Sequence, residues 1–180
     1  DLDSDGVFEP TGDDAQAPLW RALAGRRRCV EFGLDGGAVP RFPVRAAPGA
    51  SPERFELDLG GRQVEVRLSI EGEHNVRNAL AAAACAHALG IDAQTVAEGL
   101  ARFRPALGRL ARLRAASGAT LLDDSYNANP DSVRAAIAVL AAHGGRTVLV
   151  LGDMGEVGAQ GAEFHREAGE HARARGIAHL

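Results

Sequence analysis

Three stretches of the sequence place polar side chains where a helix is predicted to begin. The first contains His74, Asn75 and Asn78. Asn75 and Asn78 are three residues apart, so on a helix their amides share a face and can flank a planar polar ligand. A carboxamide offers a donor and an acceptor together, which suits adenine, and the free N–H groups of a helix start favour phosphate. Simple capping by Asn75, with Asn78 in solvent, explains the same spacing.

The second stretch, residues 121–132, places carboxylates and amides directly after an apolar strand pattern. In open α/β sheets, ligands bind at the carboxyl ends of the strands. A carboxylate in this stretch is then placed to accept both hydroxyls of a ribose, or to hold Mg²⁺ through water. Asp, Asn and Pro are also ordinary turn residues, so a plain turn is an equal alternative.

The third stretch is the glycine-rich loop 152–161, in which Asp153 or Glu156 is placed to orient a substrate or a metal ion. It has neither the GxGxxG pattern nor a lysine, so it is a poor phosphate loop, and a tight strand-to-helix turn is the preferred explanation. His165 follows on a predicted helix, where a packed or surface role is commoner than catalysis. Cys85, in an alanine-rich helix, is predicted to be core.

Regular patterns around these stretches predict the elements that position them. Alternation around Gly60-Gly61 predicts a hairpin with a primed turn, with Glu56, Asp58 and Glu65 on a solvated face. The other elements of the first half are a loop over 1–18, a helix over 19–24, a strand over 28–32 closed by Gly33 and Gly36-Gly37, a helix from Asn75 to Gly90, and a helix capped by Asp92 that runs to about Phe103.

The motif Pro105-Ala106-Leu107-Gly108 interrupts these patterns and predicts a domain boundary. The elements expected after it are strands over 110–114 and 120–122, a helix capped by Asp131 or Ser132 that runs to His143, a strand over 146–151 buried on both faces, a helix over about 162–175, and the start of a strand at 177–180. Such alternation of strands and helices indicates the beginning of a parallel α/β sheet.

Composition narrows the classes of function. The chain has 180 residues, of which 46% are hydrophobic and 24% charged, and its net charge is −4; this is typical of a globular protein. All 20 basic residues are arginine, which excludes a Walker A loop and a Schiff-base lysine within this sequence. Aromatic residues make up 4%, and with scattered arginines this argues against nucleic-acid binding. No apolar run is long enough to insert in a membrane, and two cysteines without a CxxC pattern favour a reducing, cytoplasmic setting.

Taken together, the three stretches resemble the Mur ligases of peptidoglycan synthesis. The matching residues are Gly72-x-His74-Asn75-Val76-x-Asn78-Ala79-Leu80, then Gly108-Arg109, then Asp123-Asp124-Ser125-Tyr126-Asn127-Ala128-Asn129-Pro130, and finally Leu151-Gly152-Asp153-Met154-x-Glu156-x-Gly158 with His165. The His-Asn-x-x-Asn-Ala-Leu segment is shared across the family. The Asp-Asp-Ser-Tyr-Asn-Ala-Asn-Pro string and the Gly-Asp-Met string resemble the branch that adds D-alanyl-D-alanine to UDP-N-acetylmuramoyl-tripeptide.

The resemblance implies an internal piece of an ATP-dependent amide ligase of α/β fold. Residues 1–107 would be the end of the central ATPase domain, and residues 108–180 the first part of a Rossmann-like C-terminal domain. ATP binding would involve His74, Asn75, Asn78, Arg109 and Asp124, with Asn75 and Asn78 at the adenine and Asp124 at the ribose. Tyr126, Asn127 and Asn129 would face the substrate cleft, and Gly108-Arg109 would act as a hinge.

The family's Gly-Lys-Thr phosphate loop is absent from these residues, and no firm catalytic residue or metal ligand can be assigned. We therefore expect ATP and Mg²⁺ as cofactors, with most Mg²⁺ ligands outside this chain, and no ligase activity from the 180 residues alone. We also expect a monomer. The alternatives are a sister ligase of the Mur or folylpolyglutamate type with another substrate, and a nucleotide-binding module without catalysis.

Overall fold

The computed structural model describes residues 12, 15–36 and 41–180, which form two compact units, Asp1–Phe103 and Arg104–Leu180. The acidic segment predicted as loop lies mostly outside the described residues, as does Gly37. Within the described residues, no helix has both the length and the apolar character needed to cross a bilayer.

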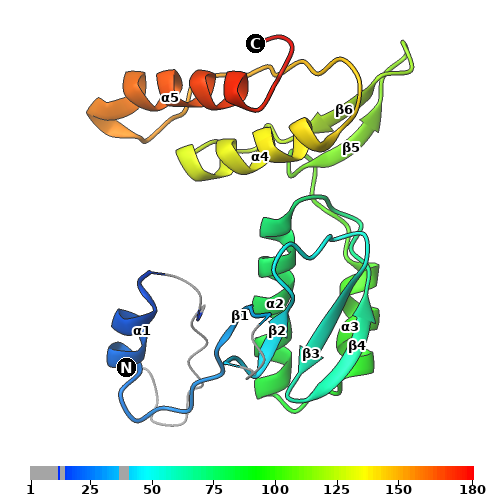
Figure 1. Cartoon of the computed structure of the whole chain (residues 1–180), viewed down its shortest axis with the longest axis vertical. Helices are drawn as coiled ribbons and strands as arrows, with labels where there is room; N and C mark the ends of the chain where they lie inside the picture. The colour runs from blue at the N-terminus through cyan, green and yellow to red at the C-terminus, as the bar shows by residue number, and fades with distance from the viewer. Residues whose placement is uncertain (1–11, 13–14, 37–40) are drawn as a thin grey trace. The chain divides into compact units, whose positions relative to one another are not determined.

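The first unit packs helices against a four-stranded sheet (Figure 1). Its elements are α1 (Ala17–Ala24), β1 (Phe32–Leu34), β2 (Val44–Ala46), β3 (Phe55–Leu59), β4 (Arg62–Val66), α2 (Glu73–Ala88) and α3 (Ala93–Arg102). The strands lie in the order β1-β2-β3-β4, with β1 and β2 parallel and the other pairs antiparallel. The β3–β4 hairpin confirms the sequence prediction: Gly60 and Gly61 both have positive φ, 63° and 89°, as a type I′ turn requires.

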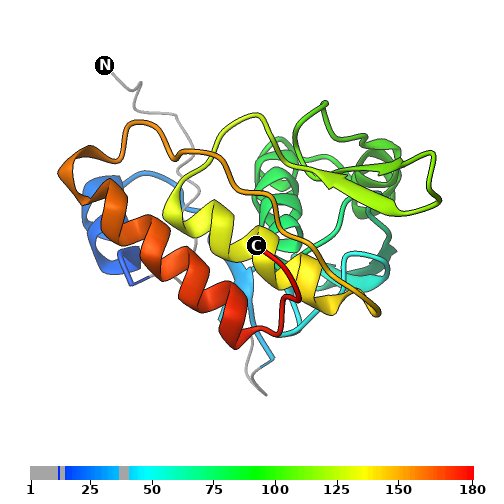
Figure 2. The same cartoon turned by 90° about the horizontal axis from the view of Figure 1, so that it is seen from above.

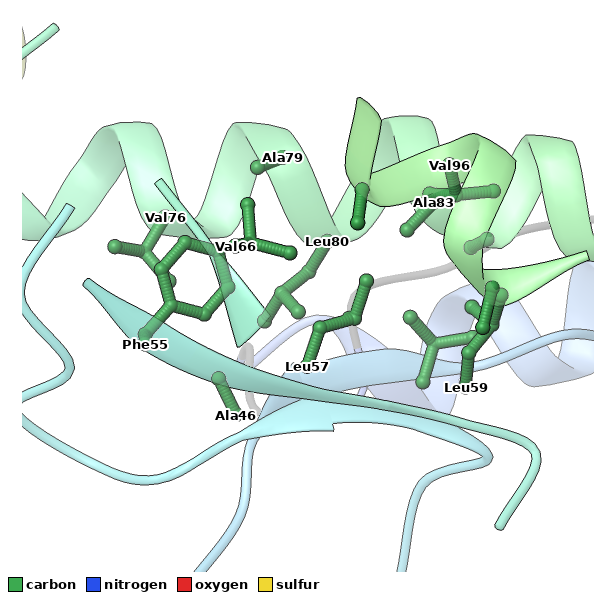
Figure 3. Packing of buried hydrophobic residues seen from close by; sticks show 14 of the residues in the cluster. Ala46, Phe55, Leu57, Leu59, Val66, Val76, Ala79, Leu80, Ala83 and Val96 are labelled. Atoms are coloured by element: carbon green, nitrogen blue, oxygen red, sulfur yellow. The ribbon is translucent and has the colours of Figure 1, made fainter. Parts of the chain in front are cut away.

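The core of the first unit lies between α2 and the sheet. Leu57, Val66, Val76 and Leu80 are fully buried, and Figure 3 shows Leu57 on the sheet pointing towards Leu80 on α2. Burial of each such side chain contributes roughly 1.5–3 kcal/mol. The apolar face of α2 thus fixes this helix to the sheet, and the first polar stretch lies at the start of the helix.

The ends of α2 and α3 follow the predicted signals. Gly90, with φ of 77°, follows the end of α2 in the left-handed conformation. Asp92 caps α3, because its Oδ1 accepts a hydrogen bond of 3.0 Å from the N–H of Thr95.

Three predictions for the first unit are wrong. The strand expected over 28–32 is β1, which begins at Phe32; Gly33 lies inside it, paired with Arg45 of β2, and does not end it. Asp58 is buried because it forms an ion pair with Arg45 and accepts a 2.8 Å hydrogen bond from the Gly61 N–H. Cys85 is exposed, since it follows the buried Ala83 and Ala84 and the helical rotation of about 100° per residue turns it away from the sheet.

The second unit contains a hairpin and two helices that pack side by side (Figure 2). Its elements are β5 (Ala111–Arg114), β6 (Thr120–Asp123), α4 (Pro130–Ala142), the 3-10 helix η1 (Gly158–Gln160) and α5 (Gly161–Ala174). Ile137 of α4, Ala172 of α5 and Met154 of the intervening loop are buried in one small cluster. The helix predicted over about 162–175 is confirmed as α5, with Gly176 at a φ of 76° just after it.

The strand predicted over 146–151 is incomplete. A single parallel bridge joins Val148 to His179, with hydrogen bonds from Leu149 N–H to His179 O (2.9 Å) and from His179 N–H to Thr147 O (3.2 Å). Burial on both faces is wrong, because Val150 is 90% exposed. An apolar β-branched run is buried only where neighbouring strands and helices cover it. Within the described part of the chain, residues 146–151 pair as a strand with residues 177–180 alone.

Candidate functional site

In the first unit, the polar residues of the first stretch meet at the beginning of α2. The Asn78 Nδ2 donates to Asn75 Oδ1 at 3.1 Å, so the two amides share a face as predicted. Asn75 is buried, and its Nδ2 donates to the Glu71 carbonyl at 2.7 Å and lies 3.0 Å from His74 Nε2. Asn78 is exposed. Asn75 therefore orients the pair, and Asn78 is the amide of the pair that is exposed.

Asn75 does not cap the helix. Gly72, with φ of 97°, takes the cap position, and its carbonyl accepts a 2.9 Å hydrogen bond from the Asn75 N–H. The capping alternative therefore does not account for Asn75, whose side chain bonds to Glu71 before the helix and to Asn78 within it.

In the second unit, the second stretch closes onto the chain just before β5. The Tyr126 N–H donates to the Gly108 carbonyl at 3.1 Å, and the Leu110 N–H donates to Asp124 Oδ1 at 3.1 Å. Between them, the guanidinium of Arg109 lies over the Tyr126 ring, with its Cζ 4.2 Å from the ring centroid. This places Arg109, Asp124 and Tyr126 in one cluster.

Asp123, which precedes Asp124 in the chain, has a carboxylate whose ionised form is stabilised by hydrogen bonds. A hydrogen bond from the Ser125 hydroxyl, followed by those from the Ser125 and Gly108 N–H groups, lowers the pKa of Asp123. Asp123 therefore carries a negative charge at neutral pH, and it follows the apolar part of β6 as the sequence predicted.

Asn129 and Asn127 make local hydrogen bonds. Asn129 Oδ1 accepts from the Ser132 N–H at 2.9 Å and the Ser132 Oγ accepts from the Asn129 N–H at 3.0 Å, which is a capping box for α4. The predicted cap at Asp131 or Ser132 is thus corrected to Asn129, because Pro130 occupies the first helical position. Asn127 Oδ1 accepts from the Ala128 N–H at 2.9 Å.

A cavity of about 640 Å³ lies in the second unit among β6, α4 and residues 148–153. Apolar side chains such as Leu122, Val133 and Leu149 line part of it, and Asp123, Asp124, Ser125, Tyr126 and Asn127 line the rest. Most of the predicted strand-end residues therefore border one space. Its lining residues do not include Arg109 or Asn129.

His165 fastens the glycine-rich loop. The Met154 N–H donates to His165 Nε2 at 3.1 Å, so the proton of the neutral ring is inferred to be on Nδ1, which lies 2.7 Å from the Gly161 carbonyl. The Asp153 carboxylate lies 3.9 Å from Nε2, and its side chain is fully exposed. His165 thus holds the loop, and Asp153 projects from it.

Sequence reasoning missed the close approach of Gly108 to Tyr126 and the part that His165 plays. A Cβ at Gly108 would lie 3.0 Å from the Tyr126 nitrogen, and no local pattern reports such an approach between distant residues. For His165 a signal existed, since Gly161 lies one helical turn before it. Among the described residues, no group of three or more His, Cys, Asp or Glu side chains is placed to hold a metal ion.

Known proteins of one family resemble this chain. The family described as Mur ligase, glutamate ligase domain, matches residues 108–180. The UDP-N-acetylmuramoyl-tripeptide--D-alanyl-D-alanine ligase of Escherichia coli is 35% identical over 176 residues, which is 98% of this chain and 39% of the relative. The enzyme of the same name from Treponema pallidum is 45% identical over 124 residues, covering 65% of this chain and 26% of the relative.

Solved structures agree. A crystal structure of MurF from Acinetobacter baumannii matches with a TM-score of 0.86 and 34% identity, covering 96% of this chain and 37% of that one. MurF ligase from Thermotoga maritima in complex with ADP matches with a TM-score of 0.76 and 25% identity, covering 94% of this chain and 38% of that one. The chain spans about two fifths or less of the length of these relatives. Residues 108–180 therefore belong to the Mur ligase family, and nearly the whole chain is similar in sequence and in its α/β fold to the ligase and the MurF structure named above.

Proposed function

We propose that this chain forms part of an ATP-dependent ligase that joins D-alanyl-D-alanine to UDP-N-acetylmuramoyl-tripeptide in peptidoglycan synthesis. The observation that carries the proposal is its 35% identity, over nearly all of its length, to an enzyme named for that reaction. Residues 1–107 would belong to the central ATP-binding domain and residues 108–180 to the C-terminal domain. ATP and a nucleotide-linked substrate imply a cytoplasmic reaction.

The proposed chemistry forms an amide through an acyl phosphate. The tripeptide carboxylate takes the γ-phosphoryl group of ATP, the amine of D-alanyl-D-alanine attacks the acyl carbon, and phosphate leaves. The acyl phosphate must be kept from water, and the charge on the phosphoryl oxygens must be neutralised. Mg²⁺ is the expected companion of ATP. The described residues contain no cluster suited to hold it, so none of its ligands is assigned here.

We propose that each unit carries residues that bind ATP. The exposed Asn78 amide, oriented by Asn75 and flanked by His74, is suited to hydrogen-bond adenine. Asp124 keeps one oxygen engaged by the Leu110 N–H, and its carboxylate is suited to accept hydroxyls of the ribose. Arg109 offers a guanidinium to the phosphates. Tyr126, Asn127 and Asn129 are the candidates for the substrate cleft, and Asn129 also caps α4.

Titration of the 180-residue chain with Mg-ATP, followed residue by residue by NMR, tests the proposed ATP-binding residues. We expect shift changes at Asn75, Asn78, Arg109 and Asp124, and weaker binding in Asn78→Ala and Arg109→Ala. Gln94→Ala is the control, because the Gln94 side chain donates to Glu98 on the exposed side of α3. Shift changes confined to other residues would contradict the assignment.

Two alternatives predict other results. A sister ligase would bind ATP at the same residues and use a different amine, and the relatives named for D-alanyl-D-alanine argue against it. A nucleotide-binding module without catalysis would bind ATP, and the product of the complete open reading frame would not turn it over.

A further inference from the structure

Residues 108–110 are bonded to the turn after β6 on both sides of Arg109. On one side the Gly108 carbonyl accepts the Tyr126 N–H, and on the other the Leu110 N–H donates to Asp124, each at 3.1 Å. The backbone of Arg109 is therefore held at both neighbouring residues by residues of its own unit.

The backbone of residues 108–110 adopts an unusual conformation that these two hydrogen bonds require. Gly108 has a φ of 76° and Leu110 a φ of 51°, both in the left-handed region that L side chains rarely adopt. A Cβ on Gly108 would lie 3.0 Å from the nitrogen and 3.2 Å from the Cβ of Tyr126. Leu110 is buried at 7% exposure. A non-glycine residue at position 108 would therefore push the Tyr126 turn away and disturb Arg109.

The side chain of Arg109 has a defined partner as well. Its Cζ lies 4.2 Å from the centre of the Tyr126 ring, inside the range in which a guanidinium is attracted to an aromatic face. The ring face carries this interaction, and the phenol hydroxyl is not needed for it. Both side chains are exposed, so the stacked guanidinium is accessible to a ligand.

We propose that Tyr126 is a positioning residue for Arg109: its ring, together with the Gly108 and Asp124 hydrogen bonds, sets the guanidinium in the orientation used for nucleotide phosphates before ATP binds. The inference rests on the proposed role of Arg109. Holding the side chain in advance reduces the conformational entropy lost on binding. Because residues 108–110 are attached to the second unit, Arg109 moves with that unit, and any pivot lies before Gly108 instead of at Gly108-Arg109.

A double-mutant cycle on Mg-ATP binding tests this. We expect Tyr126→Leu to weaken binding about two- to fivefold, the size of an exposed cation–π contact, and Tyr126→Phe to retain the wild-type affinity. In an Arg109→Ala background, Tyr126→Leu should cause no further loss. Arg114→Ala, which removes an exposed arginine at the end of β5, is the control for overall charge. An equal loss in both backgrounds would mean that Tyr126 contacts the ligand directly, and would overturn the proposal.

A second readout needs no nucleotide. The Tyr126 ring should shift the NMR signals of the Arg109 methylene protons upfield in the free wild-type chain and in Tyr126→Phe, and much less in Gly108→Ala or Tyr126→Leu. Unshifted signals in the wild type would overturn the proposal. Failure of the wild-type chain to bind Mg-ATP would overturn the proposed function and this inference with it, whereas normal binding with additive losses would overturn the inference alone.

Discussion

The two asparagines at the beginning of α2 differ in environment although their spacing makes them equivalent in the sequence. Both lie on the face that the spacing predicts, but Asn75 is buried and makes three side-chain contacts, whereas Asn78 is exposed. The spacing could be predicted from the helical period, because it is local. Burial could not, because it depends on the sheet against which α2 packs.

This difference predicts different outcomes for the two alanine substitutions. Asn75→Ala should lower the free energy of unfolding by about 1–3 kcal/mol, because it removes a buried hydrogen-bonded group. Asn78→Ala should change stability by less than about 0.5 kcal/mol and weaken Mg-ATP binding. Urea unfolding and a binding titration measure the two effects. Equal destabilisation by both variants would show that neither amide is available to a ligand.

His165 predicts a local effect on the loop that it holds. The Met154 amide should exchange with solvent about two- to tenfold faster in His165→Ala, because one hydrogen bond is lost. His165→Gln, which places an acceptor near the Nε2 position, should restore part of the protection, and His165→Asn should not. His171→Ala, on the same helix, is the control. Unchanged exchange in His165→Ala would contradict the role given to His165.

At the scale of elements, the start of α4 predicts a measurable cap. Asn129→Ala should cost about 1 kcal/mol, because it removes the side-chain acceptor of the capping box. Asp131→Ala changes the first turn without touching the cap, and it should have the smaller effect. Thermal unfolding of the two variants compares them. A larger loss for Asp131→Ala would restore the sequence-based cap assignment.

The cap of α3 predicts a dependence of stability on pH. A hydrogen bond from the Thr95 hydroxyl, followed by one from the Thr95 N–H, lowers the pKa of Asp92. The folded-state pKa is thus below the unfolded one, so the stabilisation is present above the unfolded pKa and is lost as the pH falls through the folded pKa. The stability difference between the wild type and Asp92→Asn should therefore narrow from about pH 7 to below about pH 4. A constant difference would contradict this.

Elements with local signals could be predicted from the sequence, and their environments could not. The hairpin at Gly60-Gly61 and the cap at Asp92 depend on residues a few positions apart, and both are confirmed. The sequence predicted Asp58 to be exposed and Val150 to be buried, and both predictions are wrong. The burial of Asp58 depends on its ion pair with Arg45, and that of Val150 depends on neighbouring strands. The Arg109–Tyr126 stack joins residues 17 positions apart and left no local pattern.

At the scale of the whole molecule, the absence of lysine limits what these 180 residues can do. No residue of this sequence can supply the lysine of a Gly-Lys-Thr phosphate loop. We therefore expect the chain alone to bind Mg-ATP without releasing phosphate when UDP-N-acetylmuramoyl-tripeptide and D-alanyl-D-alanine are added. Phosphate release above that of an Arg109→Ala control would show that another group in this chain replaces the lysine.

The most direct test of the proposed function is phosphate release by the product of the complete open reading frame, with ATP, Mg²⁺ and a panel of acceptors. The tripeptide nucleotide with D-alanyl-D-alanine is compared with 2,6-diaminopimelate and with alanine, the amino acids in the names of two ligases of similar fold, each with its own nucleotide substrate. We predict that D-alanyl-D-alanine is the one acceptor that supports phosphate release, and that the Arg109→Ala variant loses this release. Release that depends on another acceptor, or on none of them, would contradict the account.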